Sequence, residues 1–151
     1  MIREKCYWIG VVSRDHILHG VEGGFVQLNH GKSAPFQKMK AGDGLIIYSP
    51  RESHPKGAAL QAFTAIGKVA TGEVYVYNMT NDFKPHRLDI EFYKCEETPV
   101  KTLIPELTFI TNKTHWGGPF KLGYLKVTEQ DFKLISKAMG CAEFEEDISA
   151  E

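Results

Sequence analysis

The sequence has no long apolar run and no recognisable leader. No segment approaches the roughly 18 consecutive apolar residues that a transmembrane helix requires, so we expect no membrane partner. The apolar stretch at residues 6–12 is followed at once by Arg14 and Asp15, and no small-residue cleavage site is present. This arrangement favours a strand over a secretory signal.

Cysteine is scarce. The three residues present, Cys6, Cys95 and Cys141, are odd in number and far apart. They lack the close Cys or His spacing of a zinc site, so we expect no metal and no cofactor. Cysteines in this number and spacing favour a reducing cytoplasm as the location.

The common catalytic motifs are also missing. The chain contains no Gly-x-Ser-x-Gly elbow and no His-Glu-x-x-His helix. Residues 31–33 end like a phosphate-binding loop, but Val26 stands where that loop needs glycine, and Pro35 interrupts the helix that should follow. The six histidines are scattered; each could act as a general base, although such residues are more often structural. With no pairing of nucleophile and base, the sequence favours a protein that is not an enzyme.

Positive and negative charges nearly cancel over the whole chain, but the acidic residues are concentrated at its C-terminal end. The length of 151 residues suits a single domain, which we place at residues 1–140. Residues 141–151 form an acidic tail that we expect to be frayed. The formal net charge is −1, but without the five acidic residues of the tail the body has 18 basic and 14 acidic residues, a charge of +4. Such a body can attract phosphate, though too weakly for tight binding that ignores sequence.

The remaining pattern is one of short strands joined by turns. We predict strands at residues 7–13, 25–28, 45–49, 59–69, 73–77, 86–93 and 123–127. Residues 71–72 should connect the fourth and fifth of these strands as a hairpin. Short helical segments are expected at residues 16–21, 35–39 and 99–107, and the clearest helix at residues 128–139, capped by Thr128 and stopped by Gly140. The pattern predicts an α+β protein with a mixed or antiparallel sheet partly closed into a barrel.

A loop at residues 113–123 combines paired glycines and a proline with two large aromatic side chains. A freely exposed Trp and Phe would form an apolar patch, so this loop should either pack under the domain or touch a ligand. We expect Trp116 and Phe120 to form one wall of a ring-sized pocket, with backbone amides such as that of Gly117 at its rim.

Five segments carry a resemblance to a known family. They are residues 7–13, 23–32, 47–51, 63–67 and 115–120. In this order they resemble the EVE domain family, and the resemblance covers about residues 7–139. It implies a PUA-like fold, a curved mixed β pseudo-barrel with small flanking helices, related to the PUA, ASCH and YTH domains. Several of those relatives hold a modified or flipped base in a concave pocket, so the resemblance implies a reader of modified bases.

A base taken out of its stack presents a flat face and an edge of hydrogen-bonding groups, so its receptor needs aromatic walls and a few fixed polar groups. The expected walls, each of which could instead be core, are Trp8, Tyr48, Trp116 and Phe120. The expected edge contacts, whose alternative roles are turns and caps, are Ser13, Gln27, Asn29 and Ser49. The expected phosphate contacts are Lys32, Arg51, Arg87 and Lys121. His30 and His115 could bind a base or a phosphate, and Phe83 and Pro85 could close over the pocket.

Two functions are compatible with these residues. The first is a non-enzymatic module that binds a modified base of DNA or RNA, for example a methylated cytosine or adenine. The second is an ASCH-like hydrolase of a modified nucleoside, with Lys32 or Glu22 in the catalytic role. The sequence does not separate DNA from RNA, since a pocket for a flipped base need not touch the 2′-hydroxyl, and it does not set the oligomeric state.

Overall fold

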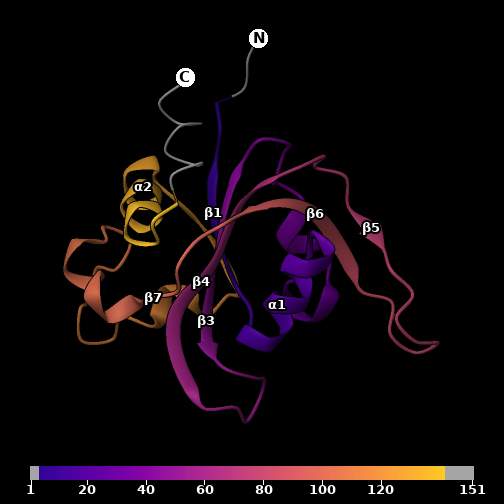
Figure 1. Cartoon of the computed structure of the whole chain (residues 1–151), viewed down its shortest axis with the longest axis horizontal. Coiled ribbons are helices and arrows are strands. Elements are labelled where there is room, and N and C mark those ends of the chain that lie inside the picture. Colours follow the sequence, from indigo (N-terminus) through magenta and orange to yellow (C-terminus); the bar gives the residue numbers. More distant parts are fainter. Residues whose placement is uncertain (1–3, 142–151) are drawn as a thin grey trace.

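A curled mixed sheet with one helix on each side forms the body of the protein (Figure 1). The computed structural model describes residues 4–141. The strands are β1 Tyr7–Val11, β2 Phe25–Val26, β3 Gly44–Arg51, β4 Ala59–Val69, β5 Tyr75–Val76, β6 His86–Tyr93, β7 Thr98–Pro99 and β8 Tyr124–Val127. The α-helices are α1 Arg14–Gly23 and α2 Glu129–Ala138. Single 3₁₀ turns are η1 Asn29–Gly31, η2 Ala34–Phe36, η3 Val100–Thr102, η4 Ile104–Glu106 and η5 Gly118–Phe120.

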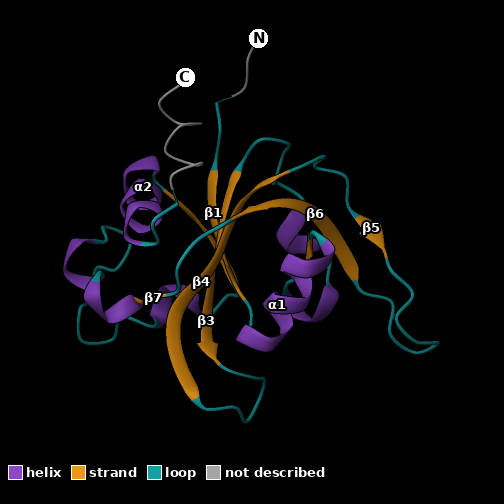
Figure 2. Ribbon diagram, viewed as in Figure 1, coloured by secondary structure: helices purple, strands orange, loops and turns teal. Residues whose placement is uncertain are grey.

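The strand order across the sheet is β2-β6-β4-β3-β1-β8, with β5 added to β6 and β7 added to β4. The β1–β3 pair is parallel, and the other pairs are antiparallel. Figure 2 shows β4 as a long curved strand, and it pairs with β3, β6 and β7. The predicted α+β class and curled half-barrel are therefore confirmed.

β1 is buried on both faces, as its continuous apolar sequence predicts. Because successive side chains of a strand point to opposite faces, Tyr7 and Ile9 join the core on the α2 side, whereas Trp8 joins a second core on the α1 side. All three side chains are buried. The sheet thus has an apolar layer on each side. Figure 1 shows α1 and α2 on these opposite sides of the sheet.

α2 forms where its sequence predicts it. The Thr128 hydroxyl caps the helix by accepting a hydrogen bond from the backbone N–H of Asp131 at 3.1 Å. Phe132, Ile135 and Met139 form its apolar stripe and are fully buried. The Asp131 carboxylate in turn accepts bonds from the backbone N–H groups of Thr108 and Phe109, which fixes the preceding loop against the helix.

Two expected elements differ from the structure. The predicted hairpin at residues 71–72 does not form, because β5 pairs with β6 and not with β4. The last residues of β4, Ile66–Val69, already pair with β6, and most of them also pair with β3, so this end of β4 has no free edge. The segment at residues 99–107 forms two 3₁₀ turns in place of one helix.

The body of the protein extends through Cys141, which is fully buried in the core under α2. The rest of the expected acidic tail, residues 142–151, lies outside the described residues.

Candidate functional site

A cleft with a volume of about 470 Å³ opens where the parallel strands β1 and β3 reach their carboxyl ends. Its size is within the range of about 300–1,000 Å³ that is usual for ligand pockets. Eight of the predicted contact residues line it: Ser13, Gln27, Asn29, His30, Lys32, Arg51, Phe120 and Lys121. The sequence therefore identified most of the segments that build this cleft.

Gln27 presents a hydrogen-bond donor of fixed orientation. Its side chain is buried, and Oε1 accepts a bond from Nε of Arg87 at 2.6 Å. Because a guanidinium can only donate, this bond assigns the oxygen to Arg87 and turns the amide NH₂ of Gln27 away from it. That NH₂ has no hydrogen-bond partner among the described residues, and Gln27 lines the cleft.

The loop after Gln27 holds three successive residues in the left-handed region, with φ of 47° at Asn29, 58° at His30 and 82° at Gly31. Asn29 Nδ2 donates to the backbone carbonyl of Leu122 at 3.1 Å, which ties this loop to the segment after η5. A Cβ atom at Gly123 would lie 1.8 Å from Asn29 Oδ1. Only glycine therefore allows the two sides of the cleft to meet here, and backbone strain of this kind often marks a ligand site.

Phe120 supplies the flat wall of the cleft. Its ring stacks on Tyr48 with centroids 4.1 Å apart and an interplanar angle of 17°. Tyr48 is buried behind it and packs edge-on against Phe63. Burial raises the pKa of Tyr48 to about 12, so this phenol stays neutral. Tyr48, predicted as a second wall, instead supports Phe120 from the core side.

Histidine rings supply much of the remaining flat surface. His16, His30 and His54 line the cleft, and the His30 and His54 ring centroids are 5.4 Å apart. Partial desolvation in the cleft lowers the pKa of His16, although the residue remains exposed; Asp15 opposes this effect, and Arg87, His19 and His30 add to it. His16 is therefore poised to be neutral at pH 7, with a nitrogen able to accept a hydrogen bond.

His16 and His54 were not among the predicted contacts, and neither were Val11, Val12, Pro50 and Gly123, which also line the cleft. Their positions in the sequence could have predicted both histidines: His16 lies three residues after Ser13, and His54 lies three residues after Arg51. The ends of β1 and β3, each together with the segment that follows it, thus contribute several residues and not single ones to the lining of the cleft.

A second pocket of about 390 Å³ adjoins the cleft and shares Ser13, His16, Gln27 and His54 with it. Arg87 lies in this second pocket and is buried. Its guanidinium carbon is 3.7 Å from the centroid of the Phe25 ring and 3.8 Å from that of Tyr77, so the group is held between two aromatic faces. Such stacking is typical of a guanidinium whose position matters.

Two predicted contacts from the strands are core residues. Trp8 lies near the start of β1 and does not line the cleft, which opens at the carboxyl end of that strand; its indole Nε1 donates to Asp43 Oδ2 at 3.0 Å in a buried bond. The Ser49 hydroxyl is buried and bonded to Thr64 Oγ1 at 2.7 Å. Both polar groups are satisfied inside the protein, so we exclude Trp8 and Ser49 from the proposed site.

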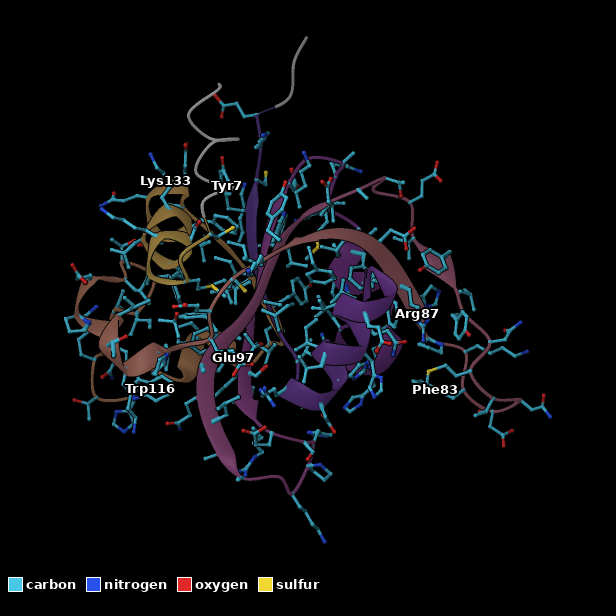
Figure 3. All side chains as sticks on the ribbon, in the orientation of Figure 1. Tyr7, Phe83, Arg87, Glu97, Trp116 and Lys133 are labelled. Atoms are coloured by element: carbon cyan, nitrogen blue, oxygen red, sulfur yellow. The ribbon has the colours of Figure 1, made fainter. Side chains whose placement is uncertain are left out.

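The remaining predicted contacts also lie elsewhere. Trp116 is half-buried against the core on the α2 side, and Figure 3 shows it on the other side of the sheet from Arg87. His115 and Gly117 are exposed beside it and do not line the cleft, whereas Phe120 at the end of η5 does. Phe83 is exposed in the loop before β6. Pro85 is buried against Gly31 and supports the loop from behind.

A larger groove of about 750 Å³ runs along α2. Its rim carries exposed charged side chains of both signs, Glu106, Glu129, Lys133 and Lys137, and no buried polar group converges on it. We therefore place the site at the cleft. Among residues 4–141, no cluster of three or more His, Cys, Asp or Glu side chains is arranged to hold a metal ion, and no helix has the length and apolarity to cross a bilayer.

Comparison with known proteins agrees with this fold. The family model of the EVE domain matches residues 6–138. The chain is 48% identical over 134 residues to the UPF0310 protein YdcG of Bacillus subtilis, covering 89% of this chain and 92% of that protein. It is 47% identical over 132 residues to a UPF0310 protein of Mycolicibacterium gilvum, covering 87% and 94%.

Solved structures show the same fold at low sequence identity. The crystal structure of Atu2648 from Agrobacterium tumefaciens has a TM-score of 0.56 at 14% identity and covers 91% of this chain and 94% of that one. The structure of human THYN1 protein in complex with 5-methylcytosine-containing DNA has a TM-score of 0.51 at 12% identity, covering 88% and 96%. The family match and the close UPF0310 relatives together show that this chain belongs to the EVE domain family.

Proposed function

We propose that this protein is a non-enzymatic nucleic-acid-binding module that holds one modified base, such as a methylated cytosine, in the cleft at the ends of β1 and β3. The observation that carries the proposal is the Gln27 amide. The bond from Arg87 uses Oε1 and leaves the NH₂ as a donor without a partner among the described residues, and Gln27 lines the cleft together with Phe120. A fixed donor next to an aromatic wall is what a flipped base requires.

Several further features support this function. Human THYN1, which shares the fold, was solved with DNA containing 5-methylcytosine. Lys32, Arg51 and Lys121 line the cleft as exposed cations, and we propose that they contact the phosphates of a DNA or RNA strand. None of the three cysteines, all of which lie among the described residues, forms a disulfide, and this supports action in the cytoplasm.

Binding is favoured over hydrolysis because no acidic side chain lines the cleft within the described chain. Glu22, one of the two catalytic candidates, is exposed on α1 and lines neither pocket. Asp15 lies in the adjoining pocket, where its Oδ1 accepts bonds from the Ser13 hydroxyl and the backbone N–H of His16. Of the two predicted catalytic candidates, only Lys32 lines the cleft.

The test is a binding series with nucleosides and short oligonucleotides, modified and unmodified, and the variant Gln27→Glu. This variant keeps the shape of the side chain and an acceptor for Arg87, but it replaces the donor that faces the cleft. We expect binding of the modified base to weaken about ten- to a hundredfold, the usual effect of a lost buried hydrogen bond. The matched control is Gln130→Glu, the same change at an exposed site on α2.

Equal binding of modified and unmodified ligands, or equal effects of the two Glu variants, would contradict the proposal. Chromatography of the same nucleosides after incubation separates the two functions. Saturable binding without a new product supports the reader, whereas turnover that is lost in Lys32→Ala supports the hydrolase.

A further inference from the structure

The pocket that adjoins the cleft has the features of an anion site. Arg87 is only 9% exposed, and its single hydrogen bond in the described chain uses Nε, which donates to Gln27. The two terminal nitrogens have no partner among the described residues, although Arg87 lines the pocket. A buried guanidinium with two unused donor groups is suited to a bidentate oxyanion.

The aromatic clamp on Arg87 serves this purpose. Phe25 lies on one face of the guanidinium and Tyr77 on the other, at 3.7 and 3.8 Å from the ring centroids. The two rings and the Gln27 bond restrict the side chain to one orientation. The terminal nitrogens are therefore held ready to bind, and little side-chain entropy is lost when an anion arrives.

Histidines complete the polar lining of the pocket. His16 and His19 come from α1 and His54 from the segment between β3 and β4. Asp15 is the single acidic side chain among the lining residues, and its Oδ1 is already engaged by Ser13 and by the backbone N–H of His16. The pocket therefore offers one permanent cation and three groups that can become cationic.

We propose that this Arg87 pocket binds a phosphate group covalently linked to the base held in the cleft, so that the ligand is a nucleotide unit and not a free base or nucleoside. The inference rests on the proposed function, because the cleft would hold the base and the Arg87 pocket would hold the phosphate of the same nucleotide. The shared lining of the two pockets by Ser13, His16, Gln27 and His54 supports it, since adjoining pockets suit adjoining parts of one molecule.

Anion binding should also take up a proton. The charges that face His16 are Asp15 and His19 on α1, Arg87 on β6, His30 in η1 and His54 after β3. An anion beside Arg87 would offset the repulsion between this cation and a protonated His16. A phosphate monoester itself titrates at about pH 6, so the uptake by His16 is the difference in proton exchange between the wild-type protein and His16→Gln on binding the same nucleoside monophosphate. Calorimetry near pH 6.5 in two buffers with different ionisation enthalpies measures this difference, which should be absent with the nucleoside.

The main experiment compares 2′-deoxy-5-methylcytidine, its 5′- and 3′-monophosphates, its 5-carboxy analogue and inorganic phosphate as ligands. We expect one monophosphate to bind at least about tenfold more tightly than the nucleoside, as a charge-assisted bidentate contact predicts. His19→Glu, which places a negative charge in the pocket without touching the Arg87 clamp, should abolish this preference. Gln130→Glu should preserve it.

Each outcome separates this inference from the proposed function. If the nucleoside and both monophosphates bind equally, or if His19→Glu keeps the preference, the phosphate site is overturned while base binding stands. If inorganic phosphate binds and is lost in His19→Glu but no nucleoside binds, the anion site stands and the base pocket fails. If the 5-carboxy nucleoside binds more tightly than the 5-methyl nucleoside but neither monophosphate does, the pocket binds an anion carried by the base itself. That result would overturn the phosphate assignment.

Discussion

At the scale of single residues, buried polar groups decide which aromatic side chains can meet a ligand. The buried indole N–H of Trp8 needs a hydrogen-bond acceptor, and the Asp43 carboxylate accepts its hydrogen bond inside the protein. Phe120 has no such group and can present a bare ring to the cleft. A tryptophan near a predicted pocket is therefore a weaker candidate when a buried carboxylate lies within reach.

Asp43 itself should be among the most sensitive positions for stability. It is fully buried, and its carboxylate accepts hydrogen bonds from the Trp8 indole and from the backbone N–H groups of Cys6 and Lys40. Asp43→Ala leaves these three donors unsatisfied, so we expect a loss of roughly 3 kcal/mol or more in the free energy of unfolding. Urea denaturation measures this loss. Asp82→Asn, in an exposed loop, should change it by less than about 0.5 kcal/mol.

His16 should make stability depend on pH. Partial desolvation, with help from Arg87, His19 and His30, lowers its pKa below the ordinary value of 6.5, so the folded state favours the neutral ring. The unfolded chain then binds more protons, and the His16 contribution is complete above pH 6.5 and declines as the pH falls toward the folded pKa. Thermal unfolding between pH 5 and about 7.5 should show a steeper decline at low pH than in His16→Gln. An NMR titration that places the His16 pKa at or above 6.5 would contradict this account.

At the scale of elements, the close contact between α1 and β2 positions both pockets. Gly20 lies on the helix face toward β2, and a Cβ there would be 2.4 Å from the backbone carbonyl oxygen of Phe25. Because that neighbour is backbone, it cannot move aside without shifting the strand. α1 carries His16 and β2 leads into Gln27, so this contact sets the distance between two walls of the site.

Gly20→Ala should therefore destabilise the protein, although alanine is the better helix former by about 1 kcal/mol. We expect a net loss of about 1–3 kcal/mol from overpacking, with weaker nucleoside binding, measured by denaturation and by calorimetry. Val21→Ala, at an exposed position of the same helix, serves as the control and should be nearly neutral. A more stable Gly20→Ala protein would show that α1 can move away from β2 without cost.

At the scale of the whole molecule, the charges favour modest electrostatic attraction. The body carries +4 without the five acidic residues of residues 141–151, and three exposed cations line the cleft. This is enough to orient a nucleic-acid strand but not to hold any strand tightly. In the proposed function, selectivity between bases must therefore come from the cleft and not from these charges.

Binding of an oligonucleotide should weaken moderately with salt. If about three to four phosphates are contacted, the slope of log K against log salt concentration should be about −2 to −4. The affinity for an uncharged modified nucleoside should be nearly independent of salt. Fluorescence anisotropy across a salt series measures the first and calorimetry the second. A slope near zero for the oligonucleotide would show that the cleft cations do not contact phosphates.

Local patterns explain which parts of the fold were predictable from sequence. The continuous apolar run of β1 and the cap at Thr128 each depend on neighbouring residues, and both appear in the structure as expected. The pairing of β5 depends on which strand edges are still free, a property of the whole sheet. The same holds for the site: Asn29 meets Leu122 across 93 positions of sequence, and no local pattern encodes that contact.

The parallel pairing of β1 and β3 has a consequence for how ligand preference can change. Parallel neighbours need a long crossover between them, and here residues 12–43 make that crossover. Ser13, His16, Gln27, Asn29, His30 and Lys32 all belong to it. Half of the residues that line the cleft thus come from one continuous stretch of sequence, so grafting that stretch from a relative onto this scaffold should transfer part of the relative's ligand preference.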